Sequence, residues 1–86
     1  MLVIKKIEHK IFDDVLSGKK KAEFRLCDFE VNEGDTLRLV EVDDDKKETG
    51  RFVDKQVTYI WKCNLKDTYW PVEEILDKGI QVISFE

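Results

Sequence analysis

Short apolar runs separated by polar turns organise this chain, a pattern typical of a small mixed fold. The segment Val3–Ile7 predicts a short strand. Ile11–Ser17 predicts a short helix, and Gly18 is placed to end it because glycine favours the backbone conformation that follows a helix. The apolar face of this helix is expected to hold Phe12, Val15 and Leu16.

The stretch GKKKAEFRL, which begins at Gly18, places three lysines ahead of a strand-like alternation. Ala22, Phe24 and Leu26 are expected to face the core, because residues two apart lie on the same side of a strand. Glu23 and Arg25 are then expected to point together away from the core.

A β-hairpin is predicted in the middle of the chain. The turn Asn32–Asp35 leads into the β-rich run TLRLVEV, and the acidic segment Asp43–Gly50 separates that run from RFVDKQVTYIW. One face of the second strand is expected to carry Val53, Val57, Tyr59 and Trp61.

The last third of the chain predicts an irregular stretch, a helical turn and a final strand. Tyr69 and Trp70 lie in the irregular stretch, Pro71 opens the helical turn and Gly79 ends it. The closing GIQVISFE reads as a strand. The fold class expected is α+β, mainly β: a small, partly closed β-barrel with one or two short helices.

Length and composition fit one such domain over residues 1–86, with 42% hydrophobic and 40% charged residues. The N-terminal residues contain no apolar run long enough for a signal peptide or a membrane span, so we expect a cytoplasmic monomer that does not engage membranes. Cys27 and Cys63 match no metal-binding spacing and are expected to be reduced thiols.

Charge is distributed unevenly along a chain whose net charge is −4. The first 26 residues carry seven Lys or Arg against four Asp or Glu, whereas residues 27–50 carry three against nine. A net-acidic domain is a poor general binder of nucleic acid, because such binding grows with the number of phosphates neutralised. A focused basic site in the first 26 residues remains open.

Several strings together resemble the ASCH domain (activating signal cointegrator homology), a branch of the PUA-like superfamily. They are IFDDVLSGKKKAEFR, DFEVNEGDTLRL, TGR, VTYI and the closing GIQVISF. The resemblance implies a β-barrel with a groove beside the first helix that binds RNA or a nucleotide-like ligand, without a cofactor or metal. The motif positions that it carries over are Lys6, Lys20, Glu23 and Arg25.

The chemistry of these side chains suits an anionic ligand. Arg25 offers a planar fork of donors, Lys20 offers a point charge, and Glu23 could orient the guanidinium or accept from a base. The plain alternative is a solvated lysine turn followed by a surface ion pair. Tyr69 and Trp70 could stack on a base as a lid or groove wall, or simply pack against the fold.

Catalysis is the second hypothesis. One branch of the family resembles an amidohydrolase that acts on acetylated cytidine and uses a lysine with a threonine three residues later. Here Glu23 follows Lys20 at that spacing, so the hydroxyl nucleophile is missing. Glu73 or Glu74 could match the distant acid of that branch or simply cap a helix. His9 is the only histidine in the sequence, so ribonuclease chemistry that uses a pair of histidines has no support. A binding module is therefore expected, with a hydrolase or a protein-interaction adaptor as alternatives.

Overall fold

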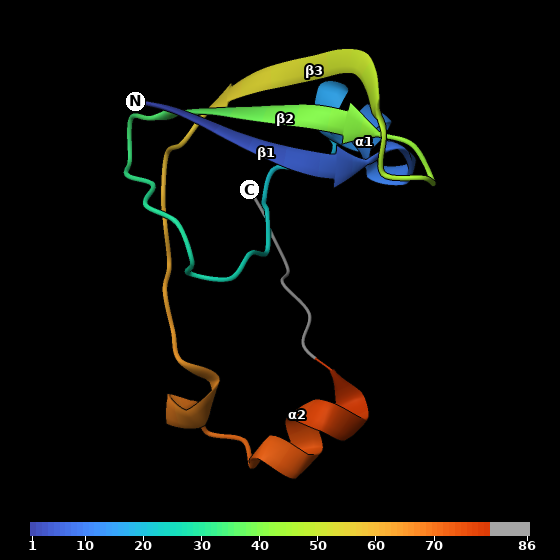
Figure 1. Ribbon diagram of the computed structural model, residues 1–86. Helices are drawn as coiled ribbons and strands as arrows, with labels where there is room; N and C mark the ends of the chain where they lie inside the picture. Colours follow the sequence, from blue (N-terminus) through green and yellow to red (C-terminus); the bar gives the residue numbers. More distant parts are fainter. Residues whose placement is uncertain (80–86) are drawn as a thin grey trace.

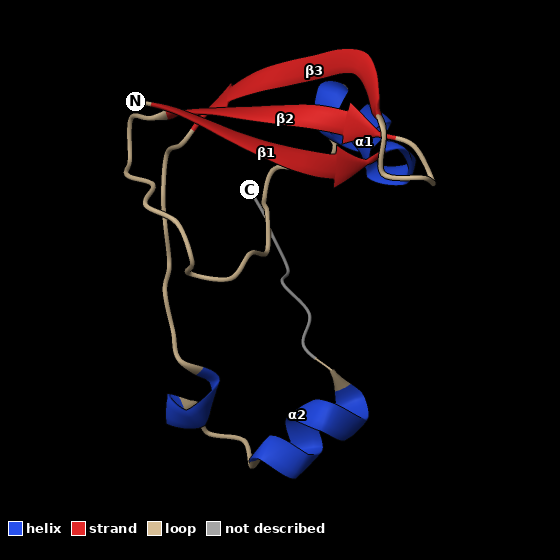
Figure 2. Ribbon diagram, in the orientation of Figure 1, coloured by secondary structure: helices blue, strands red, loops and turns tan. Residues whose placement is uncertain are grey.

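The computed structural model describes residues 1–79, which form a small α+β fold with more strand than helix (Figures 1 and 2). The strands are β1 (Leu2–Glu8), β2 (Thr36–Val42) and β3 (Glu48–Gln56). The helices are α1 (His9–Leu16), the short 3₁₀ turn η1 (Leu65–Asp67) and α2 (Val72–Lys78). The coarse prediction of a small, mainly β domain with two short helices is confirmed.

The three strands lie side by side in the order β1, β2, β3. β1 and β2 run parallel, with Ile7 opposite Glu41, and β2 and β3 form the predicted antiparallel hairpin, with Leu39 opposite Val53. Within residues 1–79 the sheet is open rather than closed on itself, so the barrel remains a prediction. The predicted closing strand over residues 80–86 lies outside the described residues.

The hydrophobic core lies where α1 packs against one face of the sheet (Figure 1). It consists of Ile7, Phe12, Val15 and Leu39, with Ile11, Leu37 and Val53 packed around them. Phe12 is 1% exposed, as its helical spacing from Val15 predicts. Leu16 is 50% exposed, so its predicted place on the buried face is wrong; it is the last residue of α1.

Both ends of α1 follow from the adjoining sequence. The helix begins at His9, two residues earlier than predicted, because β1 runs into it directly with Glu8 at the N-cap. At the other end Gly18 has φ 82°, and its N–H donates to the Val15 carbonyl at 3.1 Å. The predicted glycine stop is confirmed.

The strand predicted for Ala22–Leu26 is absent. Phe24 is 71% exposed and Leu26 is exposed too, so their assignment to the core is wrong. The alternation is real, but a strand also needs a neighbouring strand to hydrogen-bond, and none of β1, β2 and β3 pairs with this segment. Glu23, expected to point outward, is more shielded than Phe24.

The hairpin follows its predicted turn and then ends early. The Asp43 carboxylate accepts from the N–H groups of Asp45 (2.9 Å) and Lys47 (3.0 Å), which closes the acidic turn. β3 stops at Gln56, so Tyr59 and Trp61 lie beyond the strand, and both are exposed. Their predicted place on a buried strand face is wrong for the same reason as Phe24, since no described strand continues alongside them.

The C-terminal helix has the predicted boundaries to within one residue. Pro71, predicted at the first helical position, occupies the N-cap of α2, Glu73 and Glu74 lie in the first turn, and Gly79 ends the helix with φ 74°. Glycine directly after the last turn is the position that this residue favours. Neither η1 nor α2 contributes a buried residue.

Candidate functional site

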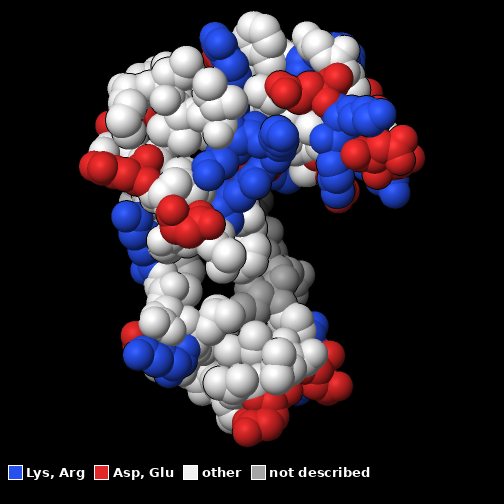
Figure 3. Space-filling view, in the orientation of Figure 1, with Lys and Arg blue, Asp and Glu red and all other residues white. Residues whose placement is uncertain are grey.

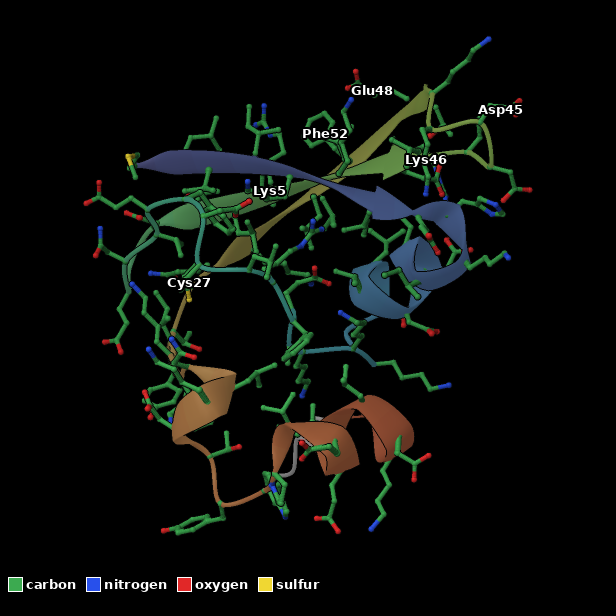
Figure 4. All side chains as sticks on the ribbon, turned by 60° about the horizontal axis from the view of Figure 1, so that its bottom comes forward. Lys5, Cys27, Asp45, Lys46, Glu48 and Phe52 are labelled. Atoms are coloured by element: carbon green, nitrogen blue, oxygen red, sulfur yellow. The ribbon has the colours of Figure 1, made fainter. Side chains whose placement is uncertain are left out.

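A cleft of about 510 Å³ opens where β1 runs into α1. It is lined by Lys6, Ile7 and Glu8 of β1, Ile11 of α1, Lys20, Glu23, Phe24 and Arg25 of the following segment, Val42 at the end of β2, and Lys46 of the hairpin turn. We call this the basic cleft. Figure 4 shows Lys46 on the hairpin turn, beside the start of α1.

Arg25 is fixed in the wall of the basic cleft by two acceptors. Its Nε donates to Glu23 Oε2 at 3.0 Å, and its Nη2 donates to the backbone carbonyl of Lys6 at 2.6 Å. The second bond ties the segment after α1 to β1. A guanidinium held at two points loses little further freedom when it binds an anion.

Lys20 shares the same carboxylate. Its Nζ forms an ion pair with Glu23 Oε1 and donates to the Ala22 carbonyl at 2.5 Å. Both oxygens of Glu23 are therefore engaged, one by each cation. The backbone N–H of Lys20 donates to the Asp14 carbonyl at 2.8 Å, which anchors the segment to α1.

The segment that carries these residues has a further contact with the sheet. The ammonium of Lys5 lies 3.7 Å from the centre of the Phe29 ring, a cation–π contact. Figure 4 shows Lys5 on the sheet. With the bond from Arg25 to Lys6, this contact holds residues 20–29 near the sheet without a strand.

The basic cleft is positively charged in a chain that is net negative. Four of its lining residues are Lys or Arg and two are Glu, a balance of +2. Lys46 Nζ lies 3.4 Å from Glu8 Oε1, which pairs one lysine with the second carboxylate. Figure 3 shows Lys and Arg side chains gathered in the middle of the sheet-bearing half of this face.

The structure brings together four of the six predicted site residues and leaves two apart. Lys6, Lys20, Glu23 and Arg25 all line the basic cleft. Tyr69 and Trp70 do not line it; they lie between η1 and α2, at the other end of the molecule (Figures 1 and 2). Tyr69 is 100% exposed, so it packs against nothing in the described chain.

Sequence reasoning missed two charged residues of the basic cleft, Glu8 and Lys46. In the sequence, the place of Lys46 behind three aspartates suggests only an exposed turn. It reaches the cleft because the hairpin brings the turn next to the end of β1.

A second group of charged side chains surrounds the buried Glu41 and joins α1 to the hairpin. Glu41 is 5% exposed and accepts from Arg51 through Nε (3.0 Å) and Nη2 (2.8 Å) and from the Thr49 hydroxyl at 2.5 Å. Arg51 Nη2 also donates to Asp13 at 3.0 Å, and the guanidinium lies 4.6 Å from the centre of the Phe12 ring.

The charges of this group hold one another in the ionised state. Hydrogen bonds from Arg51 first, and then from Thr49, lower the pKa of Glu41 to about 2. The same carboxylate, followed by Asp13, raises the pKa of Arg51. Because Arg51 donates to both Asp13 and Glu41, this group ties α1 to the hairpin.

Three other features complete the described surface. A shallower hollow of about 570 Å³, lined by Val31, Asn32, Glu33, Ile60 and Lys62, contains none of the predicted site residues. Cys27 and Cys63 are exposed and unjoined. Residues 1–79 hold no group of three His, Cys, Asp or Glu side chains arranged for a metal ion, and no helix among them has the length and apolarity to cross a membrane.

Fold and site together define a small α+β domain with a basic cleft at the end of an open sheet. The sequence model of a family described as a domain of unknown function, DUF3850, matches residues 4–73, and the chain belongs to this family. The matched range includes every residue of the basic cleft. No curated protein and no solved structure matches the chain.

Proposed function

We propose that this domain binds RNA or a nucleotide-related ligand in the basic cleft. The observation that carries the proposal is the shared location of Lys6, Lys20, Glu23 and Arg25, the motif positions, which all line this cleft. A volume of about 510 Å³ lies in the range of small-molecule sites. The guanidinium of Arg25, already held by two hydrogen bonds, offers donors in a fixed orientation, and the lysines add positive charge.

The proposal extends to the fold type. The resemblance to the ASCH domain implies a PUA-like barrel with its ligand groove beside the first helix, and the basic cleft adjoins α1 in the same way. In such a barrel, the sheet of β1, β2 and β3 would be three adjacent strands. Its remaining strands would have to come from segments outside these three.

The direct test is a titration of the isotope-labelled protein with a short single-stranded RNA and with adenosine 5′-monophosphate, followed by NMR. Resonances of Lys6, Lys20 and Arg25 are expected to shift with ligand. Arg25→Ala and Lys20→Ala should weaken binding by about tenfold or more, since a hydrogen bond to a charged group contributes about 1.5 to 3 kcal/mol.

Lys19→Ala and Lys21→Ala are the matched controls. Each removes one lysine charge from the same run, and neither residue lines the basic cleft. Equal losses across all three lysines, with normal binding by Arg25→Ala, would contradict a built site and favour a solvated turn.

The same titration separates the alternative functions. A binding module leaves the ligand intact, a hydrolase consumes it, and an adaptor that uses the acidic residues 27–50 responds to neither RNA nor nucleotide. We expect no release of acetate from acetylated cytidine, because Glu23 stands where that chemistry needs a hydroxyl and is already bound to two cations. Turnover that disappears in Lys20→Ala would contradict this expectation.

A further inference from the structure

The charges of the basic cleft can be balanced residue by residue. Glu23 carries one negative charge and is shared by Lys20 and Arg25, so that group of three keeps one positive charge. Glu8 and Lys46 offset each other. Lys6 makes no side-chain ion pair within residues 1–79 and adds a second positive charge.

The hydrogen-bonding groups left in the cleft are mostly donors. Each oxygen of Glu23 already accepts from a cation, so an amino group of a base would have to share this carboxylate with Lys20 and Arg25. Arg25 has five N–H groups and uses one on Nε and one on Nη2, which leaves both groups of Nη1 and the second group of Nη2. Lys20 keeps one N–H beyond its two bonds, and the ammonium of Lys6 makes no hydrogen bond to the described chain.

A cleft with two uncompensated positive charges and spare donors matches one ligand group closely. A phosphate monoester carries a charge of about −1.5 to −2 at pH 7 and three terminal acceptor oxygens. A phosphodiester inside an RNA chain carries a single charge and two such oxygens, and a base edge presents donors as well as acceptors. The phosphate monoester satisfies more of the cleft than either of these.

We infer that the basic cleft recognises a terminal phosphate monoester, on a free nucleotide or at the end of an RNA strand. The inference rests on the proposed function and narrows its ligand. Arg25, Lys20 and Lys6 contact the phosphate oxygens. Glu23 is a positioning residue that holds Arg25 and Lys20 without touching the ligand.

Matched ligands on the unaltered protein give the first test. Adenosine 5′-monophosphate is compared with adenosine, and a six-residue uridine RNA is used with a 5′-phosphate, with a 3′-phosphate and with hydroxyl groups at both ends. In at least one of these two comparisons, we expect the phosphate-bearing ligand to bind about tenfold more tightly than its hydroxyl counterpart. Preference in the adenosine pair alone assigns the cleft to free nucleotides, and preference among the RNAs assigns it to strand ends.

Failure of this inference is distinguishable from failure of the proposed function. Equal binding of phosphorylated and hydroxyl-ended ligands overturns the monoester inference and leaves RNA or nucleotide binding standing. No binding of any of these ligands overturns both. Inorganic phosphate alone, titrated in parallel, measures how much of the preference the phosphate group supplies without the nucleoside.

The role of Glu23 can be tested because its charge and its positioning of Arg25 and Lys20 predict opposite changes in ligand affinity. Glu23→Gln raises the net charge of the cleft by one, so a purely electrostatic site would bind adenosine 5′-monophosphate more tightly. If Glu23 positions Arg25 and Lys20, the variant binds about three- to tenfold more weakly despite the added charge. Tighter binding by a variant with unchanged thermal unfolding would overturn the positioning role.

Lys6→Met gives the complementary test, because it removes the cation that has no partner. The variant is expected to lose most of the preference for the phosphorylated ligand, whereas Lys21→Met, which removes the same charge outside the cleft, keeps it. Equal preference in the two variants would overturn the contact assigned to Lys6.

Discussion

The sheet with α1 and the segment from Val57 to Gly79 contain similar residue types and use them differently. In the first region, apolar residues from three elements converge on Phe12 and Leu39, both almost fully buried. In the second, η1 and α2 bury no side chain, and Tyr59, Trp61, Tyr69 and Trp70 are all exposed. Local signals such as Pro71 and Gly79 suffice to begin and end a helix, but burial requires a second element to pack against.

The largest expected contrast in stability comes from replacing phenylalanine by alanine at a buried and at an exposed position. Phe12→Ala removes a side chain that is 1% exposed and should lower the free energy of unfolding by about 3 to 5 kcal/mol, through lost burial and the cavity left behind. Phe24→Ala removes the same atoms from a side chain that is 71% exposed and should change it by less than about 0.5 kcal/mol.

Urea unfolding followed by circular dichroism measures both values, with the unaltered protein beside them. A large loss of stability in Phe24→Ala would show that the segment Ala22–Leu26 is buried in solution, as its alternation predicts. It would remove the distinction between this segment and the core.

The second contrast is the response to acid, which sets the buried Glu41 against a carboxylate on the hairpin turn. The pKa of Glu41 is lowered to about 2 in the folded chain by Arg51 and Thr49, from an ordinary value of 4.5. A lowered pKa contributes stability that is fully present above about pH 5 and is lost as the pH falls toward 2. The melting temperature of the unaltered protein should therefore fall over this interval, and that of Glu41→Gln should fall less.

Asp45→Asn provides the control for net charge, because Asp45 is exposed at the hairpin turn (Figure 4). Its melting temperature should follow the unaltered protein across the same pH range. Parallel slopes for Glu41→Gln and the unaltered protein would contradict the assigned role of the Arg51–Glu41 pair.

The same contrast explains how far the sequence could predict this molecule. β1, the hairpin turn, the stop at Gly18 and the boundaries of α2 depend on residues close together in the chain, and the sequence predicts them to within three residues. Ala22–Leu26 shows the limit of such reasoning. Its alternation can be read from the segment alone, but a strand forms only where a second segment pairs with it.

The candidate site divides in the same way. Glu23 and Arg25 are two residues apart and could be placed together from the motif alone. The bond from Arg25 to the Lys6 carbonyl and the approach of Lys46 to Glu8 join residues 19 and 38 positions apart, which no local pattern encodes. Glu41 meets Arg51 only through the hairpin, where the register shifts between Val40 and Val42.

A smaller effect separates the basic cleft from the acidic remainder of the chain. If single-stranded RNA binds through the basic groups of the first 26 residues, which include those of the cleft, about three or four phosphates are neutralised, and the log–log dependence of affinity on salt should have a slope of about −2 to −3. Fluorescence anisotropy at salt concentrations from about 50 to about 300 mM would measure this slope. A slope near zero would remove phosphate contact from the proposal, and a much steeper one would extend the contact surface beyond the cleft.

The smallest expected effect concerns the exposed aromatic side chains, and it tests whether the two regions act separately. Tyr69 is fully exposed and lies away from the basic cleft, so Tyr69→Ala should leave both stability and the affinity for adenosine 5′-monophosphate unchanged. A longer RNA that leaves the cleft and reaches this residue would behave differently, because stacking of one base on an aromatic ring contributes about 1 to 3 kcal/mol. Isothermal titration of Tyr69→Ala with the mononucleotide and with a long single strand separates these cases. Loss of mononucleotide binding would mean that the segment holding Tyr69 and Trp70 closes over the cleft in the complex, and the two regions would then form one site rather than two.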